Sequence, residues 1–84
     1  MAQTDLSGIS PANTVDARGS ACPGPLLEAK KAIGSIKVNE VLEVLSSDPG
    51  TKEDIPAWAG KVGHEYLGHT PSDGYDRLFV RRKK

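Results

Sequence analysis

The residues best suited to chemistry are Cys22 and the three that follow it, Pro23, Gly24 and Pro25. Cys22 is the only cysteine of the 84-residue chain, so it has no partner for an internal disulfide. A lone cysteine is more often a small buried hydrophobe than a nucleophile. The local sequence around Cys22 nevertheless favours a reactive thiol.

Cys22 lies off the apolar pattern that follows it, in the connection between a predicted strand and a predicted helix. Pro23 suits the first position of a helix, which makes Cys22 the predicted N-cap. A sulfur at that position faces unpaired backbone N–H groups and the positive end of the helix dipole, and both lower a thiol pKa. Because Pro23 and Pro25 donate no N–H, we expect a modest lowering. Their fixed φ angles hold the thiol in one orientation, and Gly24 leaves it open to another protein.

Pro25 occupies the place of the second cysteine in a C-x-x-C motif. In that motif the second thiol attacks the first and resolves a mixed disulfide. We expect the Cys22 and Pro25 side chains to share one exposed turn, so a group attached to Cys22 must wait for an external nucleophile. This arrangement predicts a carrier protein, which holds a group on Cys22 and releases it only to another molecule.

The rest of the chain predicts the elements that position the thiol. Leu26, Ala29, Ile33 and Ile36 form one apolar stripe at helical spacing. In chain order we expect a strand at 13–17, a helix from Pro23, a strand at 40–47, a helix that ends before Gly63, and strands at 64–70 and 75–82.

The second helix has two candidate starts. Thr51 to Asp54 resembles a capping box with Asp in its last position. We favour Asp54 as the N-cap, because Pro56 then falls in the first turn, where its missing N–H is not needed.

The order β-α-β-α-β-β predicts an α+β two-layer sandwich, with a four-stranded mixed sheet and two helices on one face. A right-handed crossover makes the first two strands parallel. Cys22 and the turn at 48–50 should then share the carboxyl edge of the sheet, where ligands collect. We expect residues 1–12 to be a flexible tail and residues 13–84 to form one domain.

Eleven basic and eleven acidic side chains cancel, which argues against nucleic-acid binding. Lys30 and Lys31 on the first helix are candidates for docking an acidic partner protein, although a solvated basic face is the simpler interpretation of these lysines. No apolar run approaches the ~20 residues of a membrane helix, and no signal-peptide pattern is present. With a single cysteine, the expected location is the reducing cytoplasm. We also expect a monomer.

Other candidate side chains have simpler interpretations. Arg18, in the loop before Cys22, is the residue best placed to support an anionic sulfur, although a solvated loop arginine is equally consistent with the sequence. His64 and His69 lack metal-ligand spacing, so we interpret them as structural or surface histidines. We expect no metal and no organic cofactor.

Several segments of the chain together resemble a known family. Residues 16–19 (DARG), Cys22-Pro23-Gly24-Pro25-Leu26, the strand EVLEVLSSDPGT and the segment DIPAW are similar to the TusA family of small sulfur carriers, also called SirA-like proteins. The resemblance covers about residues 14–83. Some members carry a second cysteine near the second helix, where this chain has Ala57-Trp58-Ala59.

The resemblance implies that Cys22 accepts sulfane sulfur as a persulfide from a cysteine desulfurase or a rhodanese. It implies delivery to an acceptor protein of the DsrE or TusD type, either for 2-thiouridine synthesis in tRNA or in sulfur oxidation. An alternative is a regulatory or RNA-binding module that uses the basic first helix and the C-terminal RRKK tail. A monothiol redox sensor is a further alternative.

Overall fold

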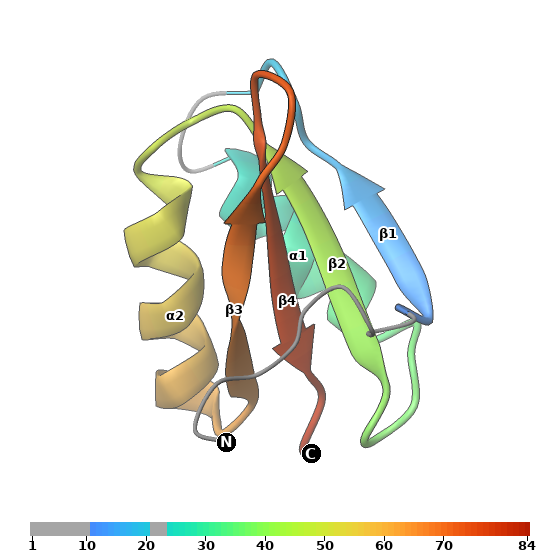
Figure 1. Cartoon of the computed structure of the whole chain (residues 1–84). Coiled ribbons are helices and arrows are strands. Elements are labelled where there is room, and N and C mark those ends of the chain that lie inside the picture. Colours follow the sequence, from blue (N-terminus) through green and yellow to red (C-terminus); the bar gives the residue numbers. More distant parts are fainter. Residues whose placement is uncertain (1–10, 21–23) are drawn as a thin grey trace, which may run out of the picture.

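The computed structural model describes residues 11–20 and 24–84, and its elements follow the predicted order (Figure 1). Cys22 and Pro23, together with residues 1–10 of the predicted tail, lie outside these described residues. The elements are β1 (Asn13–Asp16), α1 (Gly24–Ile33), β2 (Val41–Ser46), α2 (Thr51–Val62), β3 (Glu65–Pro71) and β4 (Asp76–Arg81).

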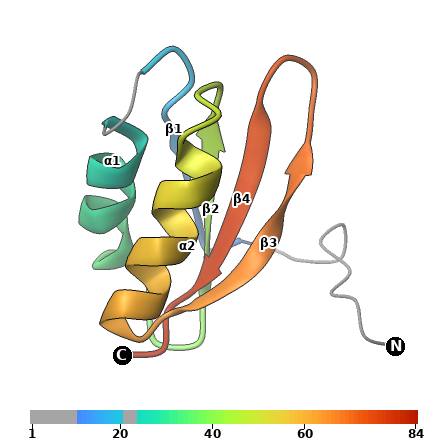
Figure 2. The same ribbon diagram turned by 90° about the vertical axis from the view of Figure 1, so that its left-hand side faces the viewer.

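The four strands form one mixed sheet in the order β1-β2-β4-β3. β1 pairs with β2 in parallel, whereas β4 is antiparallel to both β2 and β3. Both helices cover the same face of the sheet, as Figure 2 shows. The predicted two-layer sandwich, its element order and the parallel first pair of strands are therefore confirmed.

The core lies between the helices and the sheet. The predicted stripe of α1 is largely buried: Ala29 and Ile33 pack into the core, and Leu26 contacts it from a half-buried position. Ile36 is also buried, although α1 ends three residues before it. The remaining buried members of the core are Leu42, Val44, Ile55, Trp58, Ala59, Leu78 and Val80.

The predicted N-cap at Asp54 is wrong, because α2 begins one turn earlier, at Thr51. Gly50 occupies the cap position, and its carbonyl accepts a hydrogen bond from the Asp54 N–H. Pro56 consequently lies inside the helix, where it lacks the N–H that would bond to the carbonyl four residues back. Gly63 does end the helix as predicted, with a left-handed φ of 88° that suits glycine.

Candidate functional site

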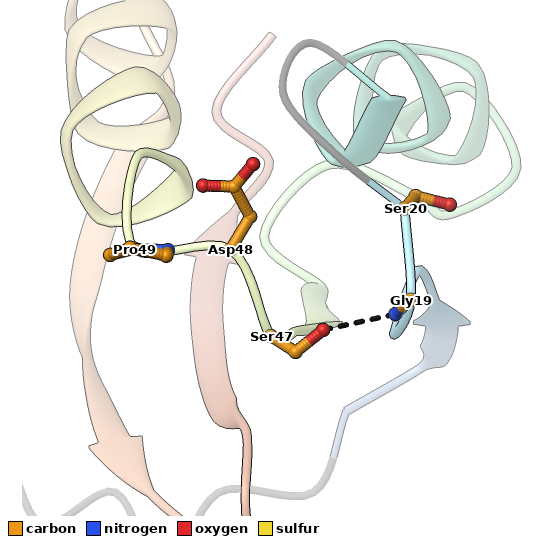
Figure 3. Close-up of a pocket in the computed structure, with 5 residues that line it drawn as sticks. All are labelled: Gly19, Ser20, Ser47, Asp48 and Pro49. Atoms are coloured by element: carbon orange, nitrogen blue, oxygen red, sulfur yellow. Dashed lines mark hydrogen bonds between the residues drawn. The ribbon is translucent and has the colours of Figure 1, made fainter.

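The loops that follow β1 and β2 meet at the carboxyl edge of the sheet. The Gly19 N–H donates a 3.0 Å hydrogen bond to Ser47 Oγ, which joins the two loops directly (Figure 3). Together they line an open pocket of about 380 Å³, formed by Gly19, Ser20, Ser47, Asp48 and Pro49. The sequence predicted that the loop leading to Cys22 and the turn at 48–50 share this edge, and the described part of the loop does so.

The β1–α1 loop turns sharply before the segment that carries Cys22. Ala17 is buried and its carbonyl accepts a hydrogen bond from the Ser20 N–H. Gly19 has a left-handed φ of 85°, which costs glycine little and would strain other residues. The buried Ala17 and this turn bring Ser20 to the surface beside the pocket.

Arg18 is engaged by Asp16, two residues earlier in the chain. Its Nε and Nη2 atoms each lie 2.8 Å from a carboxylate oxygen of Asp16. These hydrogen bonds hold the pKa of the exposed Asp16 carboxyl at about 2, below its ordinary 3.8, and raise the pKa of Arg18. The guanidinium carbon also lies 4.8 Å from the centre of the Tyr75 ring, a cation–π distance.

The predicted supporting role of Arg18 toward Cys22 stays a prediction. The described contacts of its guanidinium are with Asp16 and Tyr75, and the first of these offsets its positive charge. Arg18 therefore brings less net positive charge to the loop than an unpaired arginine would.

The turn on the other side of the pocket is fixed by short polar side chains. Ser46 Oγ accepts a hydrogen bond from the Asp48 N–H at 3.1 Å and lies 2.8 Å from Thr51 Oγ1. The Asp48 carboxylate accepts a 2.8 Å bond from the Gly50 N–H. We attribute the start of α2 at Thr51 to these hydrogen bonds. They explain why the helix begins before the predicted cap at Asp54.

The remaining residues of the predicted motif are in α1. Gly24 is the first residue of the helix, and a Cβ built on it would lie 3.1 Å from Ser20 Cβ. The described residues on the two sides of the Cys22 segment therefore lie close together.

Pro25 is fully buried, so its predicted place on an exposed turn with Cys22 is wrong. The reason is helical spacing: Pro25 lies four residues before Ala29 and eight before Ile33, on the buried face of α1. Its role is to pack the start of the helix as well as to stiffen it.

The two predicted docking lysines lie on the surface of α1. Lys30 and Lys31 are exposed, and Lys31 Nζ lies 3.7 Å from a carboxylate oxygen of Glu28. Because both side chains are exposed, both positive charges are accessible to a partner protein. The exposed ion pair with Glu28 contributes little to stability.

Both histidines have structural contacts. The His64 ring packs edge-on against Trp58 at 5.7 Å, and its Nδ1 accepts a hydrogen bond from the Lys83 N–H. His69 Nδ1 lies 3.1 Å from the Tyr66 hydroxyl. Within residues 11–20 and 24–84, no group of three or more metal-ligating side chains is placed to hold an ion. Neither described helix is long and apolar enough to cross a membrane.

Sequence reasoning did not single out Ser47 or Tyr75 as parts of this site. The position of Ser47 just after β2 was the available signal, since that position lies on the same edge as the β1–α1 loop. Tyr75 reaches the loop from the hairpin between β3 and β4, and its contact with Arg18 has no counterpart in the spacing of the sequence.

Comparisons with known proteins agree with the fold and the sequence pattern. The family model described as sulfurtransferase TusA matches residues 13–82. A protein from Archaeoglobus fulgidus, provisionally named a sulfur carrier protein, is 49% identical over 70 residues, which span 83% of this chain and 96% of that protein. The sulfur carrier protein TusA of Pseudomonas entomophila is 36% identical over 70 residues, 83% of this chain and 88% of the relative.

A solved structure has the same fold. The crystal structure of a SirA-like protein from Desulfitobacterium hafniense superposes with a TM-score of 0.74 at 24% identity, covering 86% of this chain and 99% of that one. The family match over most of the chain and the two curated relatives lead to one conclusion: this chain belongs to the TusA family of sulfurtransferases, the small sulfur carriers.

Proposed function

We propose that this protein carries sulfur between other proteins as a persulfide on Cys22. The observation that supports this most strongly is the match of residues 13–82 to a sulfurtransferase family in a chain with one cysteine. A thiol-based carrier built from this chain has Cys22 as its sole thiol.

The proposed reaction consists of two balanced exchanges. The Cys22 thiolate attacks the outer sulfur of a donor persulfide, R–S–SH, which gives Cys22–S–SH and the donor thiolate, R–S⁻. An acceptor thiolate then attacks the outer sulfur and releases the Cys22 thiolate. A thiol pKa near the ambient pH suits both steps, because it gives enough thiolate to attack and a good leaving group.

The described geometry supports access by partner proteins. Ser20, two residues before Cys22 in the sequence, is exposed beside the open pocket at the sheet edge. Lys30 and Lys31 follow on the exposed surface of the same helix that Cys22 precedes. We propose that these lysines help to dock acidic surfaces of the donor or the acceptor.

We further propose the classes of partner. The donor is a cysteine desulfurase or a rhodanese, and the acceptor is a DsrE or TusD-type protein, in tRNA thiolation or in sulfur oxidation. A reducing cytoplasm suits a thiol that must stay free of unwanted disulfides between deliveries. The exchanges require no metal or organic cofactor.

The test is mass spectrometry of the intact protein after incubation with a cysteine desulfurase and cysteine, and with a rhodanese and a sulfane donor. We expect the mass of one sulfur atom on the wild type, its loss on addition of a thiol reductant, and no addition to Cys22→Ser. Wild-type protein that stays unmodified with both donor classes contradicts the proposal.

A further inference from the structure

We propose that Ser47 and Tyr75 are positioning residues for sulfur transfer, which hold the loop before Cys22 in the orientation that a donor or acceptor protein meets. This inference rests on the proposed persulfide role of Cys22. It assigns a role to Ser47 of the β2–α2 loop and to Tyr75 of the β3–β4 hairpin, the two residues that contact the loop before Cys22.

Ser47 acts on the main chain of the loop. Its hydroxyl oxygen accepts the Gly19 N–H at 3.0 Å, and the residue is exposed, so its contribution to the core is small. Gly19 has the left-handed φ of a permissive residue, which by itself leaves the chain many alternative paths. The bond from Ser47, drawn as a dashed line in Figure 3, favours one of these paths.

Tyr75 acts on a side chain of the same loop. The Arg18 guanidinium carbon lies 4.8 Å from the centre of the Tyr75 ring, while the same guanidinium is held by Asp16. Arg18 therefore links the end of β1 to the hairpin between β3 and β4. A backbone bond from the Ser72 N–H to the Tyr75 carbonyl, 2.7 Å long, fixes the hairpin on its side of the contact.

These two contacts bear on Cys22 through a short stretch of chain. Ser20 directly follows Arg18 and Gly19 and lies near Gly24, since a Cβ added to Gly24 would lie 3.1 Å from Ser20 Cβ. Cys22 is two residues from each of them in the sequence. We infer that a shift of the loop changes how the segment between Ser20 and Gly24 meets a partner protein, and a misplacement of about 1 Å can cost up to about a hundredfold in rate.

The experiment compares pairs of variants that remove or retain each contact. Ser47→Ala removes the acceptor, whereas Ser47→Thr keeps a hydroxyl at an exposed position. Tyr75→Leu removes the aromatic ring, whereas Tyr75→Phe keeps it. For each variant we would measure kcat/KM for sulfur transfer from a persulfidated desulfurase, the pH profile of Cys22 alkylation by iodoacetamide, and the free energy of unfolding.

We expect kcat/KM with the protein donor to fall about tenfold in Ser47→Ala and in Tyr75→Leu, and to return within about twofold of wild type in Ser47→Thr and Tyr75→Phe. The alkylation profile should be unchanged, because a small reagent needs no fixed orientation of the loop. A purely structural role would instead move the unfolding free energy and leave transfer by the folded protein intact.

Two results overturn the inference while leaving the carrier role in place. One is wild-type transfer in Ser47→Ala and Tyr75→Leu. The other is an equal loss in the retaining and removing variants of a pair. If the wild type accepts no sulfur from either the desulfurase or the rhodanese, the proposed carrier function fails first, so the two failures are distinct.

Discussion

The two ends of the sheet are closed by different kinds of contact. At the carboxyl end of β1 and β2, the side chains of the exposed Ser47 and the half-buried Tyr75 contact the β1–α1 loop, in addition to a main-chain bond from the Ala17 N–H to the Leu45 carbonyl. At the opposite end the joints are between main chains: the Asn39 N–H donates to the Arg82 carbonyl, and the Arg82 N–H donates to the Glu40 carbonyl. Figure 1 shows the C-terminus at this second end, away from the β1–α1 loop.

Side chains also reinforce this second end, around Arg82, which we call the closed end. The Arg82 guanidinium donates to the carbonyls of Ile36 and Lys84, and the Lys83 N–H donates to His64. The comparison separates the Arg82 contacts of one end from the proposed site of sulfur exchange at the other. The main-chain bonds of Arg82 join the C-terminal segment to residues 39–40 at one end, while the exchange of sulfur is proposed at the end where Ser47 and Tyr75 contact the β1–α1 loop.

The largest effect is expected from Arg82→Leu at the closed end. The substitution removes two hydrogen bonds from a charged donor, one of them to a part-buried carbonyl, and should lower the free energy of unfolding by about 2 kcal/mol. Urea denaturation checks this. Arg82→Lys keeps the charge and part of the donor capacity, so it should lose less.

Sulfur loading of Cys22 should be unchanged in folded Arg82→Leu. A variant that is folded yet slow to accept sulfur would show that the two ends are coupled, and the comparison would then fail.

Substitution of two helical glycines, one at a time, is expected to change the free energy of unfolding by an intermediate amount. Gly60 lies in α2 with nothing within 4 Å of an added Cβ, so Gly60→Ala should stabilise the protein by about 0.5–1 kcal/mol through helix propensity. Gly24→Ala should show no such gain, because its Cβ crowds Ser20, and it should slow sulfur transfer. Thermal unfolding and the transfer assay test both variants. Equal stabilisation of the two would mean that Ser20 moves aside freely.

The smallest effects are expected from acid, and the two ends should respond in different pH windows. Burial, with Arg82 and Lys84 nearby, lowers the pKa of His64 below its ordinary 6.5. The unfolded chain therefore binds this proton first, and stability at the closed end falls as the pH drops below about 6.5. For Asp16 the folded pKa is about 2 against an ordinary 3.8, so its contribution is lost only between those values.

Denaturation at a series of pH values separates the two groups. His64→Gln should flatten the stability curve just below pH 6.5, and Asp16→Asn should flatten it between about pH 4 and 2. A His64→Gln curve that matches wild type down to pH 5 would mean that the imidazole contributes no pH dependence at that end.

The sequence predicted the elements and the shared sheet edge because local signals carry them. Apolar residues at helical spacing marked α1, and Gly63 marked the end of α2. The wrong predictions came from contacts between residues that are far apart in the sequence, or from turns whose sequence fits more than one helix start. The polar bonds of the turn at 46–51 start α2 early, and the burial of Pro25 depends on the sheet beneath it.

Arg18 shows the same limit within the site. Its loop position suggested a cation available to Cys22, and Asp16 was visible two residues away, but spacing alone does not tell which carboxylate a flexible guanidinium meets. The cross-chain contact with Tyr75 depends on the hairpin geometry. The bulge between Tyr66 and Gly68 in β3 also had no clear sequence signal beyond the glycine itself.

That bulge lies on one of the two outermost strands of the sheet, and the same strand ends in Pro71. A bulge interrupts the regular row of donors and acceptors, and a proline removes one donor, so β3 is a poor template for a foreign strand. The other outermost strand, β1, offers only four residues. Both edges of the sheet therefore disfavour the addition of a strand from another protein. This favours transient binding at the loops over stable intermolecular β-structure.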